Sequence, residues 1–514
     1  MPNPITIIWW IKRDARLSDN QALFNAVQDA DYVLPVFIVE PEIISADDYS
    51  AMHWHAQKTA LEALQAELQT RQADVLFLQG QPAKVFAELY RNMPFAAIYA
   101  HQETGNMLTF QRDLAVLQFC KTHGIDNIEF HQNGVIRRLS DRSLRQEVIN
   151  KRVLKRTPLA AVDLLQLPKQ IEVMESAHSA YLTSLPEVAG IFSPTEYQSI
   201  AFVELPKVTE AAAQECLHSF LYNRGLGYSG GISSPNFAFH HGSRLSAHLA
   251  WGTLSLCQAY YASAQRLQEL TGQNDSQSKQ WRRSINAFRS RLHWHCHFIQ
   301  RLETSPMMEF KPLNKAYDVI EYENDEQLLL AWQQGQTGFP LVDACMRCLQ
   351  AIGFLNFRMR AFIVSFAVFG LHLDWRLIHP HLARVFYDYE PGIHLSQLQM
   401  QAAIVGINTM RVYNPTKQLI EQDSQCRFVK KWLPELRLES VENIQAYEVL
   451  PLPNYPSPVV DFAVRTKSMK TQISTVRRSV IGKQESAKVL QKHGSRKRRK
   501  TRQQVVDERQ ISLF

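Results

Sequence analysis

The sequence has 514 residues, of which 45% are hydrophobic, and carries a formal net charge of +7 at pH 7. This length predicts two or three domains with sizeable cores, and the composition excludes a fibrous or disordered chain. The apolar runs are too short to cross a membrane, and the first residues do not form a charged leader followed by an apolar stretch and a cleavage site. We therefore expect a cytoplasmic protein without a membrane partner.

Short apolar runs alternate with amphipathic helical patterns at the start of the chain. The predicted strands are residues 5–11, 32–39, 74–78, 96–100 and 127–130. Strands and helices that alternate at this spacing favour a doubly wound parallel α/β sheet. No Gly-x-Gly-x-x-Gly follows the first strand, so the sequence does not support a standard dinucleotide site. We place this domain at residues 1–131.

Residues 132–211 are broken by prolines and are interpreted as an interdomain connector with short helices. Beyond them, strand signals fade and apolar residues recur with the period of a helix. The clearest helical patterns are residues 250–267, 325–334, 341–351, 358–372 and 376–386. The sequence therefore predicts an all-α domain over residues 212–462.

The positive charge is concentrated at the C-terminal end. Residues 465–514 hold 15 Lys and Arg against three acids, a net +12, so the rest of the chain carries −5. The run SRKRRKTR (495–502) has no apolar periodicity, which predicts a disordered or marginally helical arm able to neutralise phosphates. The alternative is a solvated tail without a partner. We place this basic tail at residues 463–514.

No metal site is expected. Cys345 and Cys348 form a Cys-x-x-Cys, but they lie in an apolar helical pattern without a second pair nearby, and the seven scattered cysteines fit a reducing compartment. His293, His295 and His297 are two residues apart on a predicted helix, so neighbouring side chains diverge by about 200° and cannot converge on one ion.

Several motifs occur in a fixed order along the chain. They are WIKRDARLSDN (10–20), GSRLS (242–246), TGFPLVDACMR (337–347), RVYNPTKQ (411–418) and FVKKWLPEL (428–436). In this order they resemble the DNA photolyase/cryptochrome family, as a divergent bacterial-type branch similar to cyclobutane pyrimidine dimer photolyases. The resemblance covers about 5–136 and 212–462, and implies an antenna-type α/β domain followed by a helical FAD-binding domain. Taken alone, the first motif is also compatible with a capped helix start whose Arg13 and Arg16 form ion pairs.

A flavin dinucleotide held without a glycine-rich loop needs donors for its diphosphate, and a helix start supplies backbone N–H groups and a favourable dipole. The resemblance assigns diphosphate contacts to Ser243, Leu245 and Ser246, with Gly242 included by position. It also suggests Tyr228 as a cofactor contact. A purely structural helix cap is the alternative for this serine-containing segment.

The flavin ring is expected beside an ion pair between Arg360 and Asp388, since relatives pair an Arg and an Asp there. Such a guanidinium can stabilise negative charge on a reduced ring. Glu390 aligns with an acid that faces the pyrimidine edge of the flavin, and His394 aligns with the residue facing flavin N5, where it could hold a proton. A surface salt bridge and a buried, satisfied histidine are the alternatives.

The residues expected to face the DNA lesion depart from those of the best-known relatives. Met400 stands where those relatives have a tryptophan near the lesion. Leu398 stands where they have the innermost tryptophan of an electron-transfer chain, and leucine cannot be photo-oxidised. Trp375 matches the retained middle tryptophan of an electron-transfer chain, while Trp294 and Met400 are candidates for an apolar rim that contacts the substrate. Loss of the usual chain need not abolish repair, because repair starts from flavin that is already reduced.

Three functions are therefore compatible with the sequence. The first is a light-driven photolyase, a monomer that splits pyrimidine dimers in DNA with reduced FAD. The second is a cryptochrome-like blue-light photosensor that binds FAD without repairing DNA. The third is a light-independent flavoprotein or nucleic-acid-binding module. In the first two, a second antenna chromophore, a folate or a deazaflavin in many relatives, is also possible.

Overall fold

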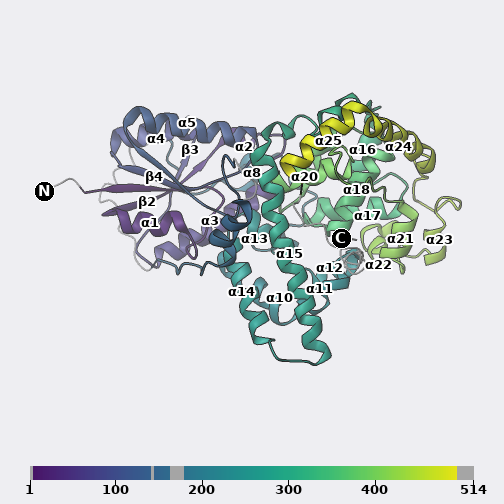
Figure 1. The fold of residues 1–514 in the computed structure, drawn as a ribbon, viewed down its shortest axis with the longest axis horizontal. Coiled ribbons are helices and arrows are strands. Elements are labelled where there is room, and N and C mark those ends of the chain that lie inside the picture. The colour runs from purple at the N-terminus through teal and green to yellow at the C-terminus, as the bar shows by residue number, and fades with distance from the viewer. Residues whose placement is uncertain (1–3, 140–143, 163–178, 495–514) are drawn as a thin grey trace.

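The computed structural model describes residues 4–139, 144–162 and 179–494 (Figure 1). Its N-terminal half is a parallel sheet in the order β3-β2-β1-β4-β5. The strands are β1 (Thr6–Ile11), β2 (Tyr32–Val39), β3 (Leu76–Gln79), β4 (Ala97–His101) and β5 (Asp126–Phe130). Each strand falls within about two residues of its predicted position. The predicted α/β class is confirmed.

Helices cover both faces of this sheet because alternate strand residues point to opposite sides. Trp9 packs in a core with α1 (Gln21–Asp29) and α3 (Ala51–Gln69), whereas Trp10 packs in a second core with α4 (Pro82–Asn92) and α5 (Met107–His123). All six residues of β1 are buried. Such continuous burial is typical of a strand at the centre of a doubly wound sheet.

A connector with short helices follows. Its elements are α6 (Arg145–Ile149), η2 (Asn150–Leu154), α8 (Val188–Ile191), α9 (Pro194–Tyr197) and η3 (Phe202–Glu204), whereas the short α2 (Pro41–Ile44) belongs to the sheet domain. The connector is not detached from the sheet. The backbone N–H of Gln79 donates to the carbonyl of Ala180, and that of Leu182 donates to the carbonyl of Phe77.

The rest of the described chain is helical, as predicted. Its first part comprises α10 (Glu210–Tyr222), η4 (Arg224–Gly227), α11 (Tyr228–Gly231), α12 (Pro235–His241), α13 (Ser246–Ala250), α14 (Leu256–Glu269), α15 (Ser276–Thr304), η5 (Pro306–Glu309) and η6 (Lys315–Val319). Its second part comprises α16 (Glu326–Gln334), α17 (Pro340–Ile352), α18 (Phe357–Phe369), α19 (Trp375–Val385), α20 (Pro391–Gln401), α21 (Pro415–Gln422), α22 (Arg427–Trp432), η7 (Pro434–Leu436) and α23 (Val441–Gln445). Cys345 and Cys348 are fully buried in α17.

The helical region does not end at 462. Two further helices, α24 (Phe462–Arg478) and α25 (Val480–His493), pack against it (Figure 1). Arg465 pairs with Glu323 at 2.7 Å, and the amide of Asn314 donates to the hydroxyl of Ser486 at 3.0 Å. The basic tail expected from 463 therefore belongs to the helical core as far as His493. The arm predicted at 495–502 lies outside the described residues.

Buried polar side chains give two of the sequence motifs a structural role. Asp343 accepts hydrogen bonds from the backbone N–H groups of Thr337 and Gly338 at 2.8 and 3.0 Å, which fixes the turn before α17. In the first motif, Asn20 caps α1 through the N–H of Leu23. The alternative of ion-paired arginines is wrong for Arg13, because its guanidinium donates to carbonyl groups of the helical region instead.

Within the described ranges, no single helix combines the length and apolar composition needed to cross a membrane. The helices α17 and α18 meet that requirement only when they are taken together, and they are bent by 118°.

Candidate functional site

Arg360 and Asp388 form a bidentate ion pair at the start of α18, as the sequence predicts. Both nitrogen–oxygen distances are 2.9 Å, and Nε of Arg360 also donates to the carbonyl of Leu355 at 2.7 Å. The Asp388 side chain is 6% exposed, while that of Arg360 is 27% exposed. The guanidinium is thus fixed in direction but still open on one side to a ligand.

His394 lies near this pair on α20. Its ring centre is 5.0 Å from that of His379 and 5.3 Å from that of Tyr389. Burial, followed by the neighbouring His379 and Arg360, holds the pKa of His394 well below its ordinary value, so the imidazole is neutral. Its Nε2 is buried and has no hydrogen-bond partner within the described residues. A buried polar atom without a partner costs stability, and a ligand can relieve that cost.

The α/β domain holds the segment that carries these residues. Arg13 donates to the carbonyl of Tyr389 at 2.6 Å, and its guanidinium lies 4.5 Å from the ring of Trp251. Nε2 of His53 lies 3.0 Å from the carbonyl of Phe386. The hydroxyl of Tyr389 donates to Asp48 at 2.8 Å. These positioning contacts were not predicted, since the motif around Arg13 indicated only that its arginines were engaged.

Glu390 faces the boundary between the two regions. It lines a cavity of about 40 Å³ together with Arg13 and His295. Burial raises the pKa of Glu390 to about 7, although Arg13 opposes the shift. Burial also lowers the pKa of His295 to about 4, and its Nδ1 has no partner among the described residues. Since its pKa is near 7, the carboxyl group of Glu390 can donate or accept a hydrogen bond near neutral pH.

The Gly242–Ser246 segment leaves donors exposed. Arg224 donates to the carbonyl of Gly242 and to that of Ser243, the latter at 2.6 Å. These two hydrogen bonds fix the backbone of the loop. A Cβ on Gly242 would lie 2.5 Å from the carbonyl oxygen of Ala238, so only glycine fits there. Leu245 is fully buried. Ser243 is half-buried and Ser246 exposed, and neither hydroxyl makes a hydrogen bond within the described part of the chain.

Tyr228 is placed differently from the other predicted cofactor residues. It is 7% exposed, and its ring packs edge-on against Phe220 at 5.3 Å and Phe288 at 6.2 Å. Burial raises the pKa of its hydroxyl to about 12. These contacts give Tyr228 a clear packing role.

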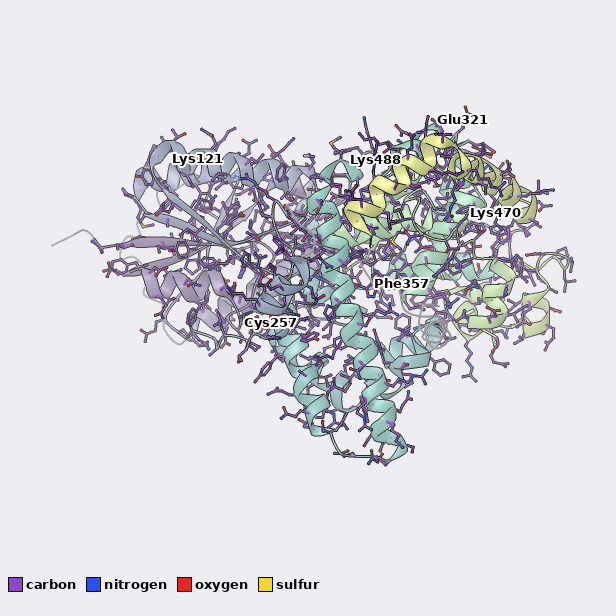
Figure 2. All side chains as sticks on the ribbon, viewed as in Figure 1. Lys121, Cys257, Glu321, Phe357, Lys470 and Lys488 are labelled. Atoms are coloured by element: carbon purple, nitrogen blue, oxygen red, sulfur yellow. The ribbon has the colours of Figure 1, made fainter. Side chains whose placement is uncertain are left out.

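The residues expected at the lesion are at least partly exposed, whereas those expected along the electron-transfer route are buried. Trp294 on α15 is 43% exposed, and its ring leans on Phe298 at 5.5 Å. Met400 is half-buried on α20, the helix of His394. Leu398 and Trp375 are buried in the helical core at 2% and 1% exposure. Figure 2 shows the side chains around this region, with Phe357 marking the start of α18.

Comparisons with known proteins agree with this arrangement. Residues 7–142 match the family model described as DNA photolyase, and residues 288–475 match that described as the FAD binding domain of DNA photolyase. The chain is 25% identical over 494 residues to a deoxyribodipyrimidine photo-lyase of Synechococcus, covering 92% of this chain and 97% of that protein. It is also 25% identical to cryptochrome DASH of Solanum lycopersicum, covering 91% and 84% of the two chains.

Among solved structures, the chain resembles an archaeal photolyase from Sulfolobus tokodaii that was crystallised with two FAD molecules. The TM-score is 0.73 at 25% identity, and the match covers 92% of this chain and all of the other.

Proposed function

This chain belongs to the DNA photolyase/cryptochrome family, with FAD as its cofactor, and on that premise we propose that it repairs pyrimidine dimers in DNA under light. The observation that carries the proposal is that Trp294 is 43% exposed on α15, and that helix α15 packs on α20, the helix of His394 and Met400. An exposed indole beside a flavin-binding helix offers a surface on which a flipped base can stack.

The residues described above fit an FAD. Arg360 and Asp388 would hold the ring, Glu390 its pyrimidine edge, and the hydroxyls of Ser243 and Ser246 the diphosphate. The unpartnered Nε2 of His394 gives a buried hydrogen-bonding atom at the same place. The chemistry that reduced FAD supplies when bound is donation of an electron to the dimer under light.

The protein's own residues prepare the site. The fixed guanidinium of Arg360 provides positive potential toward a negatively charged ring. The neutral His394 adds no charge of its own, and its buried nitrogen can hold a proton in place. Arg13, Asp48 and His53 keep the 386–390 segment from moving as DNA binds.

A second, light-harvesting chromophore is part of the same proposal. Its support is the archaeal relative, whose two FAD molecules were taken to imply such a cofactor. The test is release of all chromophores from the purified protein by denaturation, followed by separation and absorption spectra. A chromophore other than FAD, or more than one FAD per chain, is the expected result. If denaturation releases one FAD per chain and no other chromophore, the proposal of a light-harvesting chromophore is wrong.

A cryptochrome-like photosensor is the second candidate, and one observation favours it. Met400, half-buried on α20, stands where the best-known relatives have a tryptophan near the lesion, so the lesion side has changed. The two candidates differ in what light does to a thymine-dimer oligonucleotide incubated with reduced protein. Restored thymines only in the light support repair; an unchanged dimer with FAD bound supports the photosensor.

A further inference from the structure

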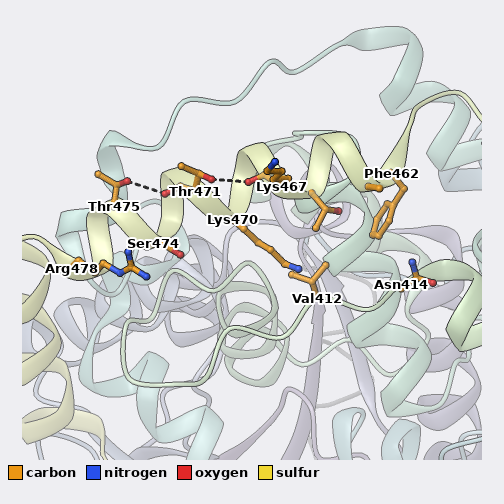
Figure 3. A pocket seen from close by; sticks show the side chains of 11 residues that line it. Val412, Asn414, Phe462, Lys467, Lys470, Thr471, Ser474, Thr475 and Arg478 are labelled. Atoms are coloured by element: carbon orange, nitrogen blue, oxygen red, sulfur yellow. Dashed lines mark hydrogen bonds between the residues drawn. The ribbon is translucent and has the colours of Figure 1, made fainter.

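A second cavity, of about 580 Å³, lies away from the flavin site (Figure 3). Helix α24 forms one wall, and Val412 and Asn414 of the 411–418 motif form the other. We name it the α24 cavity. Its lining residues are Val412, Asn414, Phe462, Ala463, Thr466, Lys467, Lys470, Thr471, Ser474, Thr475 and Arg478.

The charge of the α24 cavity is entirely positive. Lys467, Lys470 and Arg478 line it, no lining residue is acidic, and none of the three cations has an ion pair within the described part of the chain. In Figure 3, Lys470 extends from α24 toward Val412. Three cations without acidic neighbours attract an anion.

The remaining polar groups also suit an anion. Ser474, Thr471 and Thr475 bring hydroxyls to the same wall, and the last two donate to carbonyls one turn earlier at 2.9 Å. Thr466 is the independent indication of a ligand. It is 6% exposed, and its Oγ1 is buried without a hydrogen-bond partner in the described residues. Thr466 lines the cavity, and rotation of its side chain would bring this unpartnered hydroxyl to a ligand there.

Phosphate is the anion that fits these donors, since lysines, arginines and hydroxyls make most contacts to nucleic-acid backbones. The length of the row favours a polymer over a free nucleotide. Lys467 and Arg478 are eleven residues apart on one helix, or about 16 Å at 1.5 Å per residue. One DNA strand advances about 3.4 Å per phosphate, so the row spans roughly five phosphates.

The segment that forms the far wall of the cavity also contacts the helix that carries Arg360. The 411–418 motif that forms its far wall ends at Gln418, whose amide oxygen accepts a hydrogen bond from Arg358 at 3.4 Å. Arg358 lies on α18 two residues before Arg360. The 411–418 motif thus lines the α24 cavity at one end and contacts the helix of Arg360 at the other.

We propose that the α24 cavity is a DNA-backbone site that binds phosphates of the strand outside the lesion. This inference rests on the proposed function for its choice of DNA. It assigns the cationic face of α24 a binding role separate from flavin chemistry.

The test compares two triple variants by their affinity for an undamaged duplex at several salt concentrations. In the first, Lys467, Lys470 and Arg478 are each changed to Gln. In the control, the exposed Lys84, Lys121 and Lys279 are changed to Gln, which removes the same charge elsewhere; Figure 2 marks Lys121 on α5 and Lys470 on α24. We expect only the first variant to lose salt dependence, by up to about 2.7 in the slope of log K against log salt, because each phosphate contact contributes about 0.9.

Two further measurements separate this site from the flavin site. Thr466→Val keeps the shape of the side chain and should weaken duplex binding by a few-fold. Light-driven repair by the first triple variant, measured at saturating DNA in a single turnover, should be unchanged. A failure of repair in the wild type would remove the proposed function but leave the salt measurement valid. Equal slopes in both triple variants would overturn the inference, as would wild-type duplex affinity in a first variant that had lost binding of ADP or inorganic phosphate.

Discussion

The two sides of the proposed flavin site are built differently. On the inner side, Asp388 and its neighbours are held by Arg360 and by residues of the sheet domain, through hydrogen bonds of 2.6 to 3.0 Å. On the outer side, Trp294 is exposed and Met400 half-buried, and the neighbouring His297 and Phe298 provide the ring contacts of Trp294. On the proposed function, cofactor binding depends on a few fixed polar groups, whereas substrate contact depends on exposed side chains. The lesion side can therefore diverge while the flavin side is retained.

The largest expected effect is on the inner side. Arg360→Ala leaves Asp388 without its partner, and we expect FAD affinity to fall by about 100-fold, since charge-assisted hydrogen bonds contribute about 1.5–3 kcal/mol. Titration of the apoprotein with FAD measures this. Arg347→Ala is the matched control, because Arg347 is 26% exposed and pairs with Glu435 at 2.8 Å elsewhere in the helical region. Unchanged flavin binding and redox behaviour in both Arg360→Ala and Asp388→Ala would remove the assigned role.

Arg13→Ala tests whether the sheet domain positions the site. It removes donors to the carbonyls of Ala250 and Tyr389, so we expect FAD affinity to fall by about tenfold, at about 1 kcal/mol for a typical hydrogen bond. Arg282→Ala is the control, since Arg282 also donates to two carbonyls, those of Leu270 and Gln273, but far from this segment. If both variants bind FAD alike, the sheet domain does not position the cofactor.

Trp294→Ala tests the outer side. We expect affinity for a thymine-dimer duplex to fall by roughly 5- to 10-fold while FAD binding is unchanged, because stacking on an aromatic residue is worth about 1–3 kcal/mol per base. Tyr261, 37% exposed on α14, provides the control substitution Tyr261→Ala. Equal loss for damaged and undamaged duplexes would show that Trp294 does not contact the lesion.

The smallest effect concerns pH. The pKa of Glu390 is about 7 in the folded protein, above the ordinary 4.5, so the folded apoprotein binds more protons than the unfolded chain between these values. Its free energy of unfolding therefore decreases as pH rises through this window, and Glu390→Gln removes that contribution. We expect the stability of the variant, relative to wild type, to increase from pH 5 to pH 7 and then level off in urea unfolding. Parallel curves for the two proteins would contradict the shift.

The regular elements could be predicted from sequence because their periodicity is local. The strands stood out as continuous apolar runs, and the Arg360–Asp388 pair followed from the family motif. The inner-side contacts could not be predicted, since Arg13 and Tyr389 are 376 residues apart and meet only through the fold. Helix α24 was not predicted because its many Lys and Arg residues suggested a solvated tail. Its narrow apolar stripe of Phe462, Met469 and Ile473 is the pattern that could have indicated a packed helix.

The most direct test of the central claim is a single-turnover repair assay with chemically reduced wild-type protein in excess over an oligonucleotide that carries one cyclobutane thymine dimer. The account predicts that blue light restores the two thymines and that darkness does not. It also predicts that Trp294→Ala needs more protein to reach the same yield. A dimer that stays intact in the light, with reduced FAD demonstrably bound, would contradict repair of this lesion and favour the photosensor.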